Sequence, residues 1–269
     1  MNDPLGDRMK AYESAEADRR LMPLLPALGR VDGRAFHSFT KGMARPFDSN
    51  FQAAMIETAV ALMEETNANV GYTQSDEITL AWYPAIGSEI WFGGRIAKMV
   101  SQLAAHTTLH FYRACECWLP DFTDRRPLPT FDARVWNVPT LEEAANVFVW
   151  REQDATKNSI TMAAQNYYTH KELHGKSSEQ KQEMLFQKGV NWNDYPNHFK
   201  RGVYVQRRTE VHRFTTDEID KLPPRHQARS NPNLTVQRSS FATLAISPIT
   251  KIINREAVLF HGALPVVVP

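Results

Sequence analysis

Two acidic motifs offer the chemistry in this sequence. Residues 30–37 read RVDGRAFH and residues 74–77 read QSDE, and in each a short apolar run ends in an acidic residue, Asp32 or Asp76. The two carboxylates could therefore meet at neighbouring strand ends and hold a metal ion. Mg²⁺ suits such a pair, because it takes few protein carboxylates and keeps water and substrate phosphates as its other ligands. Sites of this kind transfer phosphoryl groups.

Strands must position these carboxylates. Residues 28–31 predict a first strand that ends at Asp32 and Gly33, and Gly33 lets a ligand approach the backbone closely. Residues 70–73 and 78–82 are rich in β-forming side chains and flank the second motif as the two strands of a hairpin would. Asp76 is therefore expected at a turn.

Helices are expected between these strands. Ser49 is the expected N-cap of a helix through residue 65, a second helix is expected over 91–111, and Thr140 with Glu143 forms a capping-box pattern after a strand at 131–138. The order of strands and helices is then β, α, β, β, α, β, α. It predicts an α+β fold, with an antiparallel sheet of the ferredoxin-like or split βαβ type and helices on one face.

The second half of the chain is predicted to be helical and basic. Residues 150–186 favour helix and interleave lysines with tyrosines and histidines, arginines continue to Arg238, and residues 203–207 predict one more strand. Lysine and arginine contact phosphates and aromatic rings stack on bases, so these residues suit RNA. We expect residues 1–149 to form the catalytic part and residues 150–269 a helical, basic part that packs on it as one unit.

Two further pairs of residues have helical spacing. Arg95 and Lys98 are neighbours on one helix face and can act together on one anion. His106 and His110 are one helical turn apart and could be a metal pair, but the sequence places no acidic third ligand beside them. We therefore expect the two histidines to serve packing or the surface.

Composition limits the class of protein. The chain has 269 residues, 42% of them hydrophobic and 23% charged, and a formal net charge of +1, which is ordinary for a globular protein. Its two cysteines, Cys115 and Cys117, are too few for a disulfide framework or a zinc site, and no apolar run has the length of a membrane span. We expect a cytoplasmic protein with no membrane partner.

Several motifs, in their order, resemble those of the tRNA-histidine guanylyltransferase family, which includes guanylyltransferase-like 3′–5′ polymerases. The resemblance covers about residues 6–205 and is weaker in the C-terminal part. The motifs are residues 6–10 (GDRMK), 30–37 (RVDGRAFH), 45–48 (RPFD), 71–77 (GYTQSDE), 131–134 (FDAR) and 150–154 (WREQD). Several short motifs in the right order carry more weight than any one of them.

The resemblance implies a polymerase-palm-like fold that adds nucleotides to the 5′ end of tRNA. It implies that Asp32, the Gly33 carbonyl and Asp76 bind two Mg²⁺ ions. Glu77 completes the expected catalytic set, in which it orients a ligand or strand. The resemblance also implies GTP or another nucleoside triphosphate as the substrate, together with ATP where the 5′ end is activated. The implied nucleotide-binding residues are Asp32, Gly33, Arg34, Ala35, Phe36, His37, Ser75 and Asp76. The implied residues for activation or triphosphate binding are His37, Lys41, Arg45, Arg95 and Lys98, and those that contact tRNA or nucleotide are Arg151 and Asn158. Members of the family form tetramers as dimers of dimers, which is the expectation here.

One motif departs from the eukaryotic enzymes of the family. Where these have His-Ile-Asn-Asn-Leu-Tyr-Asn, this chain reads TKNSITM over residues 156–162, and Asn158 alone keeps its place. The departure favours the guanylyltransferase-like branch, whose members repair 5′-truncated tRNA from a template rather than add one untemplated G to tRNA-histidine.

Two alternatives remain open. A nucleotide cyclase would use the same aspartate pair on a free nucleotide, although it has no use for the basic second half. A non-catalytic RNA-binding relative would keep the fold without the chemistry, although it has no reason to concentrate carboxylates beside a phosphate-binding backbone.

Overall fold

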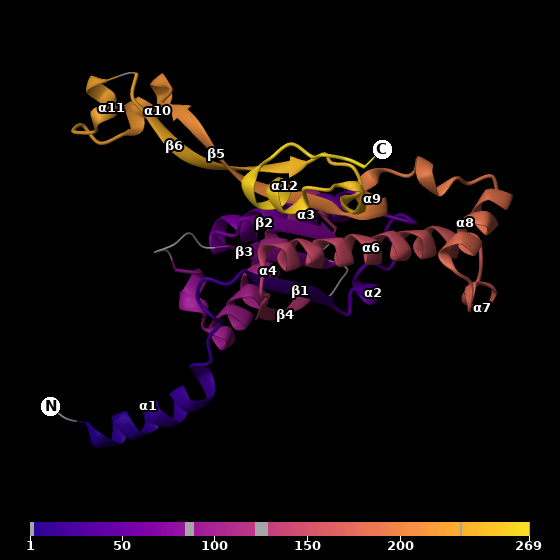
Figure 1. Cartoon of the computed structure of the whole chain (residues 1–269), viewed down its shortest axis with the longest axis horizontal. Helices are drawn as coiled ribbons and strands as arrows, with labels where there is room; N and C mark the ends of the chain where they lie inside the picture. The colour runs from indigo at the N-terminus through magenta and orange to yellow at the C-terminus, as the bar shows by residue number, and fades with distance from the viewer. Residues whose placement is uncertain (1–2, 84–88, 122–128, 232, 269) are drawn as a thin grey trace.

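One antiparallel sheet organises the molecule. The computed structural model describes residues 3–83, 89–121, 129–231 and 233–268 (Figure 1). Within them six strands follow the order β4-β1-β3-β2-β5-β6. The strands are β1 (Ala27–Arg34), β2 (Val70–Gln74), β3 (Glu77–Trp82), β4 (Thr130–Asn137), β5 (Val203–Arg213) and β6 (Thr235–Leu244).

Helices fill the connections. The longer ones are α1 (Pro4–Ala17), α3 (Ser49–Thr66), α4 (Ile96–Trp118), α6 (Leu141–Gln165) and α8 (Ser178–Gln187). The short ones are α2 (Phe36–Phe39), α7 (His170–Leu173), α9 (Asn197–Arg201), α10 (Thr216–Lys221), α11 (Gln227–Ser230) and α12 (Arg255–His261), with 3₁₀ turns η1 (Trp91–Gly94), η2 (Trp192–Asp194) and η3 (Ile249–Lys251). None of the helices in the described residues is long and apolar enough to cross a bilayer.

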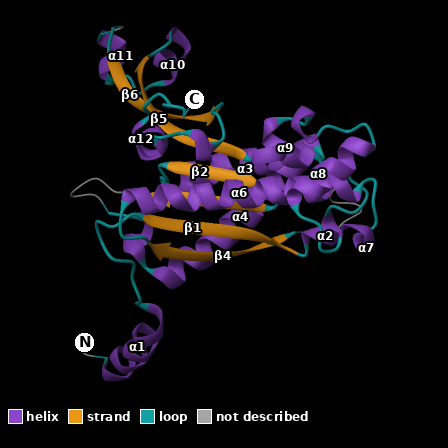
Figure 2. Ribbon diagram, turned by 45° about the vertical axis from the view of Figure 1, so that its right-hand side comes forward, coloured by secondary structure: helices purple, strands orange, loops and turns teal. Residues whose placement is uncertain are grey.

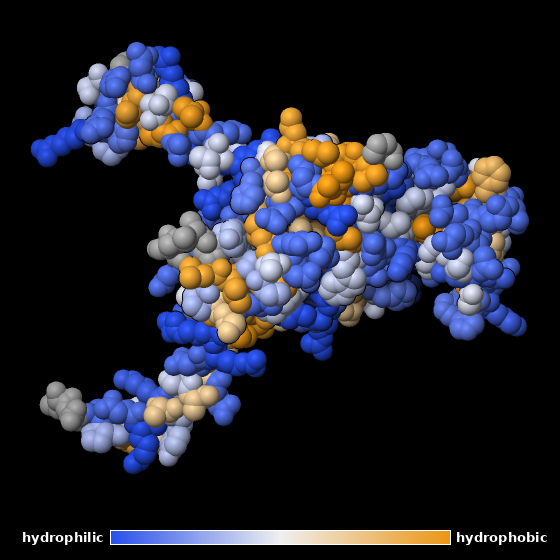
Figure 3. All heavy atoms as spheres, viewed as in Figure 1, coloured by the Kyte–Doolittle hydropathy of each residue, from blue (hydrophilic) through white to orange (hydrophobic). Residues whose placement is uncertain are grey.

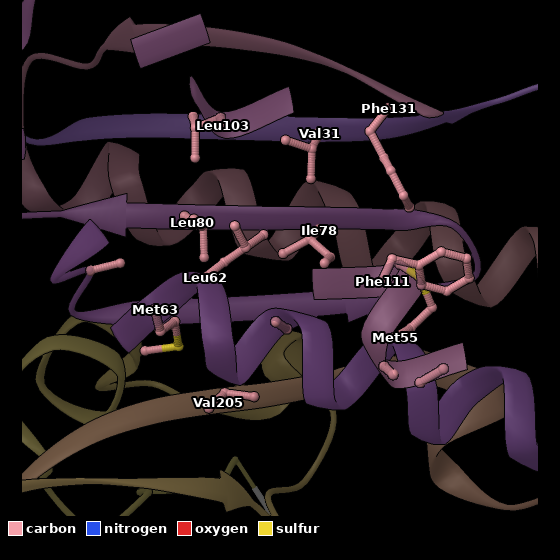
Figure 4. Close-up of a cluster of buried hydrophobic side chains, with 14 of the residues drawn as sticks. Val31, Met55, Leu62, Met63, Ile78, Leu80, Leu103, Phe111, Phe131 and Val205 are labelled. Atoms are coloured by element: carbon pink, nitrogen blue, oxygen red, sulfur yellow. The ribbon is translucent and has the colours of Figure 1, made fainter. Parts of the chain in front are cut away.

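The first four strands have the predicted ferredoxin-like order. Strands β4, β1, β3 and β2 lie side by side and every pair is antiparallel. Helices α3 and α4 make the crossovers and bury one face of the sheet (Figure 4). Val31, Leu62, Ile78, Leu103 and Phe111 lie in that core, each at most 1% exposed. The predicted antiparallel α+β fold is confirmed.

A second layer covers the opposite face, which the sequence did not predict. Helix α6 lies over this face and runs along the strands (Figure 2), and α12 packs beside it. Phe148 of α6 packs in one apolar cluster with Leu28 and Tyr72 of the sheet and Leu259 of α12. Strand β2 is buried on both faces, and so its side chains carry no alternation that would have revealed this layer.

The second half of the chain contains more strand than expected. Helix α6 runs through the expected boundary at residues 149 and 150, and β5 extends the sheet by pairing with β2. The predicted strand at 203–207 continues to Arg213 and pairs with β6 along its length, and the far part of this hairpin, with α10 and α11, projects from the body (Figure 1). The projecting part has a mainly hydrophilic surface in Figure 3.

The helix after the first motif begins one residue away from its expected cap. Asp48, and not Ser49, is the N-cap of α3, because its carboxylate accepts hydrogen bonds from the backbone N–H groups of Asn50 and Phe51, both at 3.0 Å. The same carboxylate accepts a bond of 3.1 Å from the N–H of Ala44, so it also fixes the loop before the helix.

We predict that Asp48→Ala lowers the free energy of unfolding by about 1 kcal/mol, the usual value of an N-cap. Ser49→Ala is the matched control and should change it by less than about 0.5 kcal/mol, as a substitution without a special role does. Urea denaturation of both variants measures the difference. A larger loss in the Ser49 variant would contradict the assignment of the cap.

Candidate active site

The two predicted aspartates lie on adjoining backbone segments at one end of the sheet. Asp32 is near the end of β1, opposite Glu77 of β3, and Asp76 is in the turn between β2 and β3. The N–H of Gly33 donates a 3.0 Å hydrogen bond to the carbonyl of Asp76, which fastens the turn to β1. The structure therefore brings the two acidic motifs together.

Gly33 makes this close approach possible. A Cβ atom at this position would lie 2.2 Å from the ring of Phe36 and 2.8 Å from the Cβ of Asp76. Any larger residue would push the turn away from β1. Ser75, just before Asp76, has a φ of 49°, so the turn also uses a left-handed residue.

Asp32 and Asp76 differ from the other acidic residues around them. Within the described residues, neither forms an ion pair with lysine or arginine, whereas Asp132 on the neighbouring strand binds Arg134 at 2.8 Å. Burial raises the pKa of Asp76, and the charge of Asp32 raises it further. Two neighbouring carboxylates without a lysine or arginine partner in the described residues can share a cation, and oxygen ligands of this kind fit Mg²⁺.

Glu77 has a different environment from Asp76, although the two are adjacent. Its carboxylate accepts two hydrogen bonds from Arg151 of α6, at 2.6 and 2.8 Å, and Arg30 Nε lies 3.7 Å away. The ring of Trp150 lies against both arginines, 4.5 Å from the guanidinium carbon of Arg151 and 5.6 Å from that of Arg30. Burial raises the pKa of Glu77 while the two arginines oppose that rise. Glu77 thus holds α6 on the sheet.

This ion pair continues along α6. Arg151 also donates to Asp154 at 2.9 Å, and the side-chain amide of Asn158 donates to the same carboxylate at 3.3 Å. Asp32, Asp76, Asp154 and Asn158 all line one open cavity of about 380 Å³. The predicted residues Arg151 and Asn158 therefore lie at the aspartate pair.

A second cavity of about 260 Å³ adjoins the first, and the two share Gln74, Ser75 and Asn158 in their walls. It lies between the loop after α2, helix α3, the turn before Asp76, and helices α6 and α9. Its walls are partly aromatic, with Phe47 stacked on Phe199 at a centroid distance of 4.9 Å. A cavity with apolar walls and a few polar groups is typical of a small-molecule site.

The other predicted residues of the first two motifs and Arg45 lie near the two cavities, in different environments. His37, Arg45 and Ser75 line the second cavity. Phe36 is 5% exposed and packs among other phenylalanines, so only its backbone can face a ligand. Arg34 and Ala35 follow Asp32 at the end of β1, where Ala35 has a φ of 59°.

Arg95, Lys98 and Lys41 line neither cavity in the described part of the chain. Helix α4 starts beside the segment that leads into β1, because the N–H of Ile96 donates to the carbonyl of Arg19 at 2.9 Å. Arg95 and Lys98 therefore lie where β1 begins, whereas Asp32 lies near its end. Within a single chain, Arg95 and Lys98 therefore do not reach Asp32. Their role in binding triphosphate stays a prediction.

Sequence reasoning missed several lining residues. Asp154 and Gln165 of α6 line the first cavity, and Phe47, His198 and Phe199 line the second. Asp154 carried a usable signal, because it is three residues after Arg151 and four before Asn158, and so lies on the same helix face. Phe199 carried none, since α9 reaches the cavity only through the tertiary fold.

Comparisons with known proteins agree with this geometry. The family model described as tRNAHis guanylyltransferase matches residues 6–139. A solved structure named as a bacterial tRNA(His) guanylyltransferase (Thg1)-like protein in complex with ATP is 39% identical, covers 75% of this chain and 88% of its own, and has a TM-score of 0.70. A second, named as such a protein in complex with GTP, is 31% identical over 93% of this chain and 95% of its own, with a TM-score of 0.69.

A curated relative gives the same result at lower identity. The tRNA(His) guanylyltransferase of Debaryomyces hansenii is 29% identical over 237 residues, which are 82% of this chain and 87% of that protein. The sequence motifs and the fold agree with this similarity. The chain belongs to the tRNAHis guanylyltransferase family of nucleotidyltransferases.

Proposed function

We propose that this protein is a Mg²⁺-dependent enzyme that adds nucleotides to the 5′ end of tRNA, so that the strand grows in the 3′–5′ direction. The observation that carries the proposal is the unpaired carboxylate pair, Asp32 and Asp76, beside a cavity with partly aromatic walls. Relatives solved in complex with ATP and with GTP support a nucleoside triphosphate as the substrate.

Asp32, the Gly33 carbonyl and Asp76 would hold the Mg²⁺ ions. When bound, Mg²⁺ lowers the pKa of an attacking hydroxyl and neutralises charge on the phosphates. The chain itself contributes the fixed separation of the two carboxylates, set by the hydrogen bond of 3.0 Å between the Gly33 N–H and the Asp76 carbonyl. Burial at Asp76 reduces competition from water for its oxygens.

The shared wall of the two cavities gives the nucleotide its orientation. A nucleobase would stack against the paired rings of Phe47 and Phe199, and the phosphates would then extend past Ser75 and Asn158 toward Asp32 and Asp76. Arg45 lines the second cavity together with these rings and offers a cation to a phosphate. Base and phosphates are thus held at separate points, which fixes the reacting end.

The reaction needs an activated 5′ end, because a 5′-monophosphate has no good leaving group. The 3′-hydroxyl of the incoming nucleotide attacks the 5′-phosphorus of the tRNA, a new P–O bond forms, and the hydroxyl proton is lost. AMP leaves from an end that has been adenylylated with ATP, and pyrophosphate leaves from a triphosphorylated end. In-line displacement of this kind relies chiefly on positioning and on stabilisation of charge.

We further propose that the enzyme repairs 5′-truncated tRNA against a template. The support is the sequence of residues 156–162, in which Asn158 alone keeps the eukaryotic motif. Asn158 is held by Asp154 on the cavity side of α6, where it can contact the nucleotide or the RNA.

Extension of a tRNA tests the function directly. A labelled tRNA that lacks its first nucleotide, and full-length tRNA-histidine, are incubated as mono- and triphosphates with Mg²⁺, ATP and each nucleoside triphosphate. Asp32→Asn and Asp76→Asn should each reduce extension at least about 100-fold, since the metal contributes several kcal/mol and each 1.36 kcal/mol is tenfold. Asp132→Asn is the control and should retain activity, because Asp132 is paired with Arg134.

The products distinguish the alternatives. Addition of the complementary nucleotide to the truncated tRNA supports repair, and a single G on tRNA-histidine opposite any base supports maturation instead. Cyclic product from GTP alone would favour a cyclase. Absence of extension on every substrate would refute the proposed function.

We predict a second effect from the ion pair that holds α6. Arg151→Met removes the partner of a buried carboxylate and should lower the free energy of unfolding by about 3–5 kcal/mol. The double variant with Glu77→Gln should lose less, since no charge is left buried. Urea denaturation of the single and double variants measures the coupling.

The surface pair formed by Arg134 and Asp132 provides the control. The side chains of these residues are 50% and 60% exposed, so Arg134→Met should cost less than about 1 kcal/mol. Equal losses for Arg151→Met and Arg134→Met would show that the pair with Glu77 is not what holds the helix.

A further inference from the structure

We propose that Glu65, His106 and His110 form a binding site for a divalent transition metal of the zinc type, separate from the aspartate pair. The two histidines were expected to serve packing or the surface, because the sequence places no acidic residue beside them. The packing of α3 against α4 supplies the missing ligand, because it brings Glu65 of α3 to the histidines of α4.

The three side chains are close enough to share one ion. One ligand atom from each lies within 4.8 Å of the others, and His106 Nε2 is 3.8 Å from a carboxylate oxygen of Glu65. The rings of His106 and His110 are nearly parallel, 6.1 Å apart and inclined by 23°. Bonds of about 2.0–2.2 Å to zinc require only that the ligand atoms draw together slightly. Glu65, whose side chain is 44% exposed, has room to make that movement.

The donor set selects the class of metal. Two imidazole nitrogens and one carboxylate are the ligands of open zinc sites, which keep water in the fourth position. Two histidines one helical turn apart also occur in helical zinc motifs. Mg²⁺ prefers a shell of oxygens, so it should bind at Asp32 and Asp76 and not here.

His110 gives an independent indication of a ligand. Its Nε2 atom is buried and has no hydrogen-bond partner among the described residues, which is costly for an imidazole nitrogen. Metal coordination would satisfy it.

The site is accessible and distant from the catalytic carboxylates. His106 is 24% exposed at its side chain, so an ion can enter past Glu65, while the ring of Trp91 lies 6.1 Å from the ring of His106 on another side. Glu65 is near the end of α3, just before β2 begins, whereas Asp76 follows the other end of β2. A bound ion would thus link α3 to α4 without touching the nucleotide.

Metal binding to the full chain without an affinity tag tests the proposal. Zn²⁺ and Co²⁺ are titrated in millimolar Mg²⁺, which occupies the aspartate pair. We expect one equivalent of Zn²⁺, a visible Co²⁺ spectrum with nitrogen ligands, and a higher melting temperature when Zn²⁺ is present.

Glu65→Gln and His106→Asn should each weaken binding by more than the roughly 10- to 100-fold that loss of an outer-shell partner costs. Both residues are partly exposed, so these variants should fold. The control is His170→Ala with His174→Ala, a second pair one turn apart that has no third ligand among the described residues. This double variant should bind Zn²⁺ as tightly as the natural chain does.

Two results would overturn the proposal. One is the absence of Zn²⁺ uptake by the natural chain in excess Mg²⁺. The other is uptake that neither Glu65→Gln nor His106→Asn weakens, or that the control variant weakens equally. Since the readout is metal binding and not tRNA extension, either result leaves the proposed function untouched.

Discussion

The ion pair between Glu77 and Arg151 is the interaction on which the site depends. It joins β3 to α6 across 74 residues of sequence, with both side chains 7% exposed or less. Withdrawing two charges from water costs several kcal/mol per ion, so such a pair contributes through its geometry more than through its energy. The two parallel hydrogen bonds set the rotation and height of α6 on the sheet. That setting turns Asp154 and Asn158 toward the aspartate pair and makes α6 a wall of both cavities.

The distribution of charge around this pair explains how neighbouring carboxylates take different roles. Glu77, Asp132 and Asp154 each have an arginine at 2.9 Å or less, and they are thereby neutralised locally. Asp32 and Asp76, at the end of the sheet, form no such close ion pair within the described residues. Their mutual repulsion and the burial of Asp76 work against folding, and a cation relieves both. Regions of unfavourable charge of this sort are typical of catalytic sites.

Much of the catalytic half could be predicted from the sequence, because its information is local. Strands that end in Asp32 and turn at Asp76 follow from short apolar runs, and the crossover helices follow from their periodicity. The layer made by α6 and α12 could not be predicted. Strand β2 is buried on both faces, so its sequence has no alternation of polar and apolar residues from which a second covered face could be inferred.

The placement of side chains was harder to predict than the elements that carry them. Arg95 and Lys98 were expected on a helix, and they lie at its start, but the direction of α4 puts that start at the far end of the sheet. Glu65 and the two histidines show the converse. Their proximity depends on how α3 and α4 pack, and sequence spacing within one helix cannot report it.

The order of the strands also dictates the order in which the protein can assemble during synthesis. Residues 27–137 contain β1 to β4 with both crossover helices, so this sheet can close as soon as they have left the ribosome. Strand β5 must then find β2, with Tyr72 paired to Tyr204, across a long intervening chain, and non-local pairing of this kind is slow. In that order of assembly Asp32 and Asp76 would come together before α6 and α9 arrive to enclose the second cavity. A nascent chain released early would carry exposed carboxylates and an open β2 edge, which is a point of attachment for other strands.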